Sequence, residues 1–159
     1  MSIELNTKAP DFTADTDGGG KITLSENKGK WIVIYFYPKD STSGCTTEAC
    51  NFRDNYERLS TLNAVILGVS PDSVKSHDNF KAKQELNFSL ISDTDKSICE
   101  SYGVWVEKSM YGKKYMGVER STFIIDPEGN IKKIYRKVKV NGHVDTVIAD
   151  LQALQSSAE

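Results

Sequence analysis

The chain has 159 residues, of which 38% are hydrophobic and 26% are charged, and its formal net charge is −2. This length predicts a single domain over residues 1–159, and the apolar content excludes a wholly disordered chain. The small negative charge provides no general attraction to nucleic acid or to an anionic membrane, and no stretch of about 18 apolar residues predicts a membrane span.

Three cysteines are too few for a disulfide scaffold. The first residues, Met1 to Leu5, contain no basic region followed by an apolar run, so they do not resemble a secretory signal. We therefore expect a cytoplasmic protein in a reducing compartment. There, a close pair of cysteines is catalytic or metal-binding rather than structural.

The predicted strands appear in chain order as one hairpin followed by longer apolar runs. Residues 11–14 and 21–24 flank a glycine-rich turn and predict an N-terminal β-hairpin. Continuous apolar runs predict three strands buried on both faces, at residues 31–37, 63–69 and 121–125. After a turn at residues 126–130, residues 131–135 predict a returning antiparallel strand.

Helical periodicity marks most of the remaining segments. Apolar side chains recur at helical spacing in two stripes, Cys45, Ala49, Phe52, Tyr56 and Leu59 in the first and Val144, Val147, Ile148, Leu151 and Leu154 in the second. Residues 73–84 predict a more polar helix, residues 95–102 a short helix, and residues 107–117 an exposed loop. Strands that alternate with helices predict an α/β fold with helices on both faces of a central sheet.

A cysteine occupies the junction between the first buried strand and the next helix. The strand ends at Pro38, which has no N–H to donate, and Gly44 permits a tight path into the helix. Cys45 then lies in the first helical turn, where free backbone N–H groups and the helix dipole favour a thiolate over a thiol. The thiolate is the nucleophilic form, so this location predicts a reactive cysteine at a strand end.

A second cysteine, Cys50, follows five residues after Cys45. In an intact helix this separation places the two Cα atoms roughly 8–9 Å apart, whereas a disulfide needs about 4.4–6.8 Å. A bond between these two cysteines therefore requires the first turns of the helix to unwind.

Several segments together resemble one family. The pattern Pro-x-x-x-Thr-x-x-Cys at residues 38–45 matches the active-site signature of peroxiredoxins, and Glu-x-Cys at residues 48–50 resembles their bacterioferritin comigratory protein, or Q-type, subgroup. Residues 9–12 resemble the opening of that subgroup, and residues 120–126 resemble a later strand that brings an arginine to the site. The resemblance covers most of the chain and implies a thioredoxin-like fold with a mixed central sheet.

The same resemblance implies a thiol-dependent peroxidase that reduces hydrogen peroxide and organic hydroperoxides. Cys45 would be the peroxidatic cysteine, which becomes a sulfenic acid and releases water or an alcohol. Cys50 would condense with this acid to an intramolecular disulfide, which thioredoxin or a similar dithiol would reduce. Q-type relatives are often monomers, and we expect neither a cofactor nor a metal.

Four further residues acquire roles from the resemblance. Thr42 would hydrogen-bond the thiolate and the peroxide, and Pro38 would shield the sulfur from solvent. Arg120 would hold the thiolate charge and polarise the O–O bond, with Glu48 orienting it through an ion pair. Ser43 stands where family members often have proline, which predicts a more flexible loop or a capping role for the serine.

Simpler interpretations remain open for these residues. Cys45 would then be an inert buried thiol and Cys50 a structural one. Thr42 would serve only helix entry and Glu48 only the helix dipole. By its position alone, Arg120 would be a solvated charge at the start of a strand.

The other candidate ligands fit no site. Cys99 is expected to be a small core residue without redox duty, with a second resolving role as the alternative. His77 and His143 are far apart in the sequence, and Cys-x-x-x-x-Cys without a second pair of ligands is poor spacing for zinc.

Two other functions compete with the peroxidase. A glutathione-peroxidase-like enzyme would use the same fold, but the matching Gln and Trp motifs are missing from the sequence. A non-catalytic binding protein would use the Cys45–Cys50 disulfide to switch a partner surface. Only the peroxidase needs Cys45 to react with peroxide far faster than a free thiol does. The sequence leaves the preferred hydroperoxide and the reductant open.

Overall fold

The computed structural model describes residues 3–157, and a seven-stranded mixed sheet forms its centre. The strand order is β2-β1-β5-β4-β3-β8-β9. The bounds are Thr13–Thr16 for β1, Lys21–Thr23 for β2, Trp31–Phe36 for β3, Ala64–Ser70 for β4, Ser89–Ser92 for β5, Ser121–Ile125 for β8 and Ile131–Tyr135 for β9. β3, β4 and β5 are parallel, whereas β8 runs antiparallel to β3.

The central strand β3 is buried along its whole length. Its alternate side chains enter two separate apolar clusters, with Val33 and Tyr35 in one and Ile32 and Ile34 in the other. A continuous apolar run is what a strand covered on both faces requires, so the prediction of a central buried strand is confirmed.

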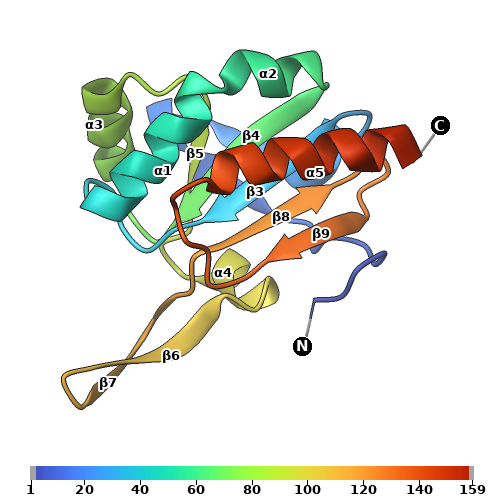
Figure 1. The fold of residues 1–159 in the computed structure, drawn as a ribbon. Helices are drawn as coiled ribbons and strands as arrows, with labels where there is room; N and C mark the ends of the chain where they lie inside the picture. The colour runs from blue at the N-terminus through green and yellow to red at the C-terminus, as the bar shows by residue number, and fades with distance from the viewer. Residues whose placement is uncertain (1–2, 158–159) are drawn as a thin grey trace.

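Helices cover both faces of the sheet, as predicted (Figure 1). One face carries α1 (Ser43–Asp54), α2 (Tyr56–Thr61), α3 (Val74–Gln84) and α5 (His143–Ser157). The short helix α4 (Ser97–Ser101) packs on the other face. The N-terminal β-hairpin also forms, with β1 and β2 joined by a 3-10 turn at Asp17–Gly19. Among the helices within residues 3–157, none has the length and apolar character to cross a membrane.

Three features of the structure differ from the predicted elements. The apolar stripe from Cys45 to Leu59 does not form one helix, because Asn55 leaves helical geometry and separates α1 from α2. Tyr56, the first residue after the break, is exposed, whereas Leu59 farther along the same stripe is buried. No sequence pattern predicted β5, because this strand has only four residues.

The predicted exposed loop at residues 107–117 is instead an antiparallel hairpin of β6 (Trp105–Met110) and β7 (Lys113–Val118). It projects from the body of the molecule (Figure 1). Tyr111 and Gly112, both with positive φ, make its two-residue turn. Most of its side chains are exposed on both faces, so no alternation of apolar residues marks it in the sequence.

Candidate active site

The first helix begins at the end of β3, the central strand of the sheet. Backbone pairing of Tyr37 N with Val69 O closes the strand, and a short loop then leads to Ser43, the first residue of α1. Thr42 occupies the N-cap position, but its hydroxyl donates to Lys39 O at 2.9 Å and caps no helical N–H. The predicted capping role of Ser43 is therefore wrong, because Ser43 already lies inside the helix.

Cys45 is the third residue of α1 and is almost completely buried, with 1% of its surface exposed. Arg120 Nη2 donates a hydrogen bond to Cys45 Sγ at 3.3 Å. The sheet register explains this contact, because Phe36 pairs with Ser121 and so brings Arg120 to the end of β3 where α1 begins. A cation and a helix N-terminus thus meet at one sulfur atom.

Gly44 leaves room for the guanidinium. A Cβ atom at this position would lie 3.3 Å from Arg120 Nη2, closer than most Cβ contacts. The backbone at Gly44 is helical, so the requirement here is space rather than an unusual φ.

Glu48 lies one turn after Cys45 on the same helix and is completely buried. Its Oε1 accepts a hydrogen bond from Arg120 Nη1 at 2.7 Å. Burial raises the pKa of Glu48 to about 7, and the attraction of Arg120 offsets only part of this effect. Its Oε2 atom has no hydrogen-bond partner among residues 3–157. Arg120 therefore bridges the carboxyl group and the sulfur.

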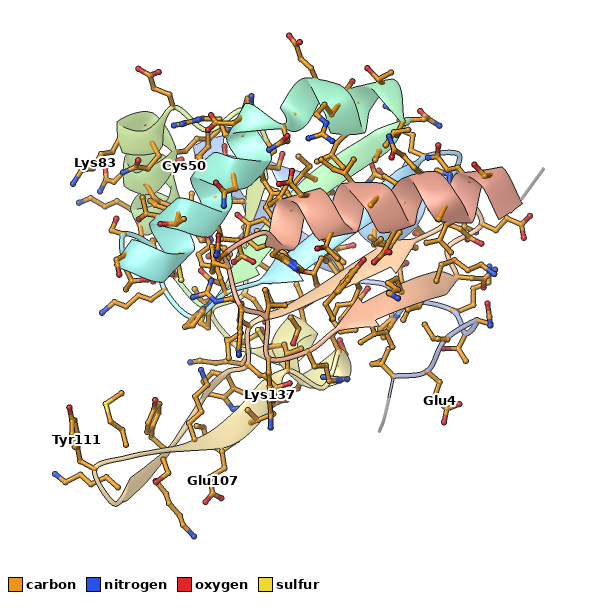
Figure 2. The ribbon with its side chains drawn as sticks, viewed as in Figure 1. Glu4, Cys50, Lys83, Glu107, Tyr111 and Lys137 are labelled. Atoms are coloured by element: carbon orange, nitrogen blue, oxygen red, sulfur yellow. The ribbon has the colours of Figure 1, made fainter. Side chains whose placement is uncertain are left out.

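Cys50 faces the C-terminal end of α3 (Figure 2). Its thiol is half-buried and donates to Gln84 Oε1 at 3.6 Å. Both cysteines lie within the intact helix α1, and all three cysteines of the chain are free. The helix geometry keeps the two sulfur atoms apart, as the spacing predicts.

Cys99 is buried in α4, on the other face of the sheet. Burial raises the pKa of its thiol far above the ordinary value, and the nearby Asp93 carboxylate adds to this shift. Such a thiol is a poor nucleophile at neutral pH.

Three residues near the site were not predicted from the sequence. Burial lowers the pKa of Lys108 on β6, and the positive charge of Arg120 lowers it further. Asp40, in the loop that leads to Cys45, forms a buried pair with His77 of α3. No sequence pattern connects these positions, which lie on three separate elements.

The second histidine is also buried close to the site. His143 Nε2 lies 2.8 Å from Thr122 Oγ1 on β8. Burial lowers the pKa of His143 to about 4, and the positive charge of Arg120 contributes. Across residues 3–157, no group of three or more His, Cys, Asp or Glu side chains is arranged to hold a metal ion.

A model of the AhpC/TSA family matches residues 5–134. The chain belongs to the AhpC/TSA family. Among its relatives, the putative peroxiredoxin Bcp of Coxiella burnetii is 54% identical over 151 residues, covering 95% of this chain and 100% of the relative. The peroxiredoxin Bcp of Bacillus subtilis is 52% identical over 152 residues, covering 96% of this chain and 97% of the relative.

Two similar solved structures have the same fold. Peroxiredoxin Q of Xanthomonas campestris has a TM-score of 0.89 and 51% sequence identity, covering 95% of this chain and 96% of the relative. A cysteine-to-serine mutant of Xylella fastidiosa PrxQ has a TM-score of 0.91 and 40% identity, covering 100% and 99% of the two chains. These similarities confirm the predicted subgroup, the thioredoxin-like fold and the enzyme class, a thiol-dependent peroxidase.

Proposed function

We propose that Cys45 is the peroxidatic cysteine of this thiol-dependent peroxidase and that Cys50 is its resolving cysteine. The observation that carries the proposal is the hydrogen bond from Arg120 Nη2 to Cys45 Sγ at the start of α1. Neither Cys50 nor the deeply buried Cys99 has a comparable cationic donor on its sulfur within residues 3–157.

In the first step, the Cys45 thiolate attacks one oxygen of the hydroperoxide. An S–O bond forms, the O–O bond breaks, and the leaving oxygen takes up a proton and departs as water or an alcohol. The guanidinium of Arg120 stabilises the negative charge that passes from sulfur to the leaving oxygen. Glu48 holds the guanidinium in place by accepting a hydrogen bond from its other terminal nitrogen, Nη1.

Thr42 and Pro38 define the approach to the sulfur in this proposal. Because the Thr42 hydroxyl already donates to Lys39 O, its oxygen is free to accept a hydrogen bond from the O–H of a hydroperoxide. Half-buried Pro38 lies at the other end of the same loop and limits the access of bulk water.

In the second step, the Cys50 thiol attacks the sulfenic sulfur of Cys45. A disulfide forms and water leaves, which requires the first turns of α1 to unwind. A thioredoxin-like dithiol then reduces the disulfide. We propose that the enzyme works as a monomer in the cytoplasm, where such dithiols keep proteins reduced.

Hydrogen peroxide and organic hydroperoxides are the proposed substrates. The bacterioferritin comigratory protein of Xanthomonas campestris, which is 50% identical to this chain, has alkyl peroxide reduction activity. That relative supports the inclusion of alkyl hydroperoxides among the substrates.

The test combines cysteine variants with mass mapping after one equivalent of peroxide. Cys45→Ser should abolish peroxide reduction and leave the fold intact, because it removes the nucleophile. Cys50→Ser should complete one peroxide reduction and then stop at the sulfenic acid. Cys99→Ala is the matched control and should turn over like the parent. Substantial peroxide turnover by Cys45→Ser would refute the assignment, and thioredoxin-dependent turnover by Cys50→Ser would show a different resolving thiol.

A further inference from the structure

The loop between β3 and α1 is anchored by one buried side chain. Of residues 38–44, Asp40 alone is buried, and the others are half-buried or exposed. Ser41, the next residue, has a φ of 64°, which is uncommon for a non-glycine residue. The position of this loop therefore depends on the groups that bind Asp40.

The Asp40 carboxylate receives three donors. Tyr37 donates its hydroxyl to Oδ1 at 2.6 Å, and Ser76 donates its hydroxyl to Oδ2 at 2.8 Å. His77 Nδ1 lies 2.7 Å from the same Oδ2 atom. Ser76 and His77 belong to α3, so this helix holds the loop through its first turn.

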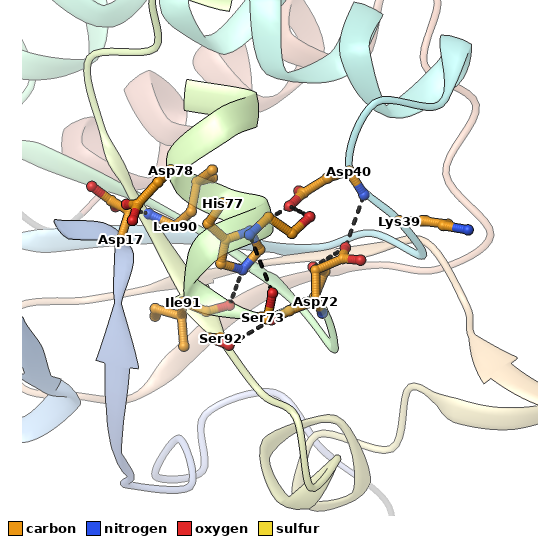
Figure 3. Close-up of polar contacts among 12 residues, drawn as sticks. Asp17, Lys39, Asp40, Asp72, Ser73, His77, Asp78, Leu90, Ile91 and Ser92 are labelled. Carbon is orange, nitrogen blue, oxygen red and sulfur yellow. Dashed lines mark hydrogen bonds and ion pairs between the residues drawn. The ribbon is translucent and has the colours of Figure 1, made fainter. Parts of the chain in front are cut away.

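His77 connects Asp40 to the sheet (Figure 3). Its Nε2 lies 2.9 Å from Ile91 O, and a carbonyl only accepts, so Nε2 carries a proton. Since Tyr37 and Ser76 already donate to the carboxylate, the remaining proton of the pair belongs on Nδ1. Burial lowers the pKa of His77, but the hydrogen bond and charge of Asp40 outweigh this and leave it raised. The pair is thus an imidazolium and a carboxylate, both almost wholly excluded from solvent.

We propose that His77 is a positioning residue for the peroxide reaction and acts through Asp40 to hold Pro38 and Thr42 over Cys45. The proposal rests on the proposed function, because it concerns the same reacting sulfur. Pro38 and Thr42 each lie two residues from Asp40, one on either side. Loss of His77 would leave a buried carboxylate without its cation, and moving Asp40 toward water would carry both residues with it.

The first test compares two reactions of Cys45 in His77→Ala and Asp40→Ala. In single-turnover experiments, the rate of reaction with hydrogen peroxide should fall roughly tenfold or more, because small displacements of groups that bind the reacting atoms have large kinetic effects. Alkylation of the same thiol by iodoacetamide uses no contact with Pro38 or Thr42, and its rate should change little. If His77 only stabilised the fold, its loss would not change the rate with hydrogen peroxide more than the rate with iodoacetamide.

Two further variants serve as controls. In Asp40→Asn, the new amide can donate to an unprotonated Nδ1 while Nε2 keeps its bond to Ile91, so the peroxide rate should stay close to that of the parent. Phe80→Leu removes buried volume from the same helix α3 without removing a hydrogen bond of Asp40. It should lower stability and leave the peroxide rate of the folded protein unchanged.

A peroxide rate at the parent level in His77→Ala would overturn the positioning role, as would an equal loss in both reactions. If His77→Ala does not fold, the comparison of Asp40→Ala with Asp40→Asn decides, and equal peroxide rates in these two would overturn the proposal. A parent protein that does not reduce peroxide at all would refute the proposed function instead, so the two failures are distinguishable.

Discussion

At the scale of single residues, the site depends on how one guanidinium is shared. Arg120 contacts Cys45 Sγ at 3.3 Å and Glu48 Oε1 at 2.7 Å, through two different nitrogen atoms. The carboxyl group of Glu48 is buried in α1, so the guanidinium has little freedom to move away from the helix. Anything that fills the space between α1 and the guanidinium must therefore lengthen its hydrogen bond to the sulfur.

Gly44→Ala tests this arrangement. Alanine is favoured over glycine in a helix by about 0.5–1 kcal/mol, so the free energy of unfolding should be unchanged or higher. The added Cβ would lie 3.3 Å from Arg120 Nη2, and weakening that charge-assisted bond by about 1 kcal/mol would slow the peroxide reaction about fivefold. Stopped-flow rates and urea unfolding measure the two effects.

Ser43→Ala is the matched control, since it changes the neighbouring exposed residue at the same helix start. It should leave the peroxide rate close to that of the parent. If Gly44→Ala also reacts at the parent rate, the space at residue 44 has no role in placing the guanidinium.

The sequence predicted part of this residue-scale arrangement. A local motif marks Cys45 and Glu48, and the resemblance to a family supplies Arg120, which the fold does bring to the sulfur. The pairing of Asp40 with His77 was not predictable, because 37 residues separate them and neither lies in a recognisable pattern. Such a contact follows only from the packing of α3 against β5.

At the scale of elements, α3 holds both ends of the segment that must rearrange. Its first turn binds Asp40 through His77, and at its C-terminal end Gln84 O accepts from Arg53 Nη1 at 2.6 Å. Cys45 and Cys50 lie between these two attachment points. The unwinding that the disulfide needs is therefore confined to the loop and the first turns of α1.

Thr47 offers a way to change the cost of that unwinding without touching the site. Its side chain is exposed on α1 between the two cysteines. Thr47→Ala should make the helix more stable and Thr47→Gly less stable, with a difference of about 1 kcal/mol. After sulfenic acid formation, disulfide formation should therefore be up to about fivefold faster in the glycine variant than in the alanine variant, with equal rates for the peroxide step.

Ala149→Gly provides the control for this prediction. Ala149 is exposed on α5, which takes no part in the rearrangement, so the substitution should cost similar helix stability and leave disulfide formation unchanged. Rapid-quench mass spectrometry follows both steps. Identical disulfide rates in the two Thr47 variants would mean that α1 does not unwind in the rate-determining step.

The elements that sequence patterns predicted well are those with a buried face. β3 is a continuous apolar strand, β8 is buried along its whole length, and α5 has a clear apolar stripe. The hairpin of β6 and β7 escaped prediction because its stability comes from backbone pairing, with little apolar surface turned to the core. The break at Asn55 was hidden because the apolar spacing continues across it.

At the scale of the whole molecule, two buried groups near Arg120 give stability opposite dependences on pH. His143 keeps its neutral form down to a pKa of about 4, whereas in the unfolded chain a histidine titrates at 6.5, so His143 makes the fold less stable as pH falls from 6.5 to 4. Glu48 keeps its proton up to a pKa of about 7, against 4.5 in the unfolded chain, so it makes the fold less stable as pH rises from 4.5 to 7. The two contributions largely cancel in the parent protein.

Removing either side chain should therefore expose the pH dependence of stability that the other one causes. In His143→Gln, no buried histidine at this position destabilises the fold at low pH. As the pH falls from 7.5 to 5, the free energy of unfolding of this variant should therefore rise by about 2 kcal/mol relative to that of the parent. In Glu48→Gln, no buried carboxyl group at this position has to become charged at high pH. As the pH rises from 5 to 7.5, the free energy of unfolding of this variant should therefore rise by about 2 kcal/mol relative to that of the parent. Urea unfolding of the three proteins at both pH values measures these differences. If these stability differences stay constant with pH, His143 and Glu48 have the same pKa values in the folded and unfolded states. Burial beside Arg120 would then not shift their pKa values.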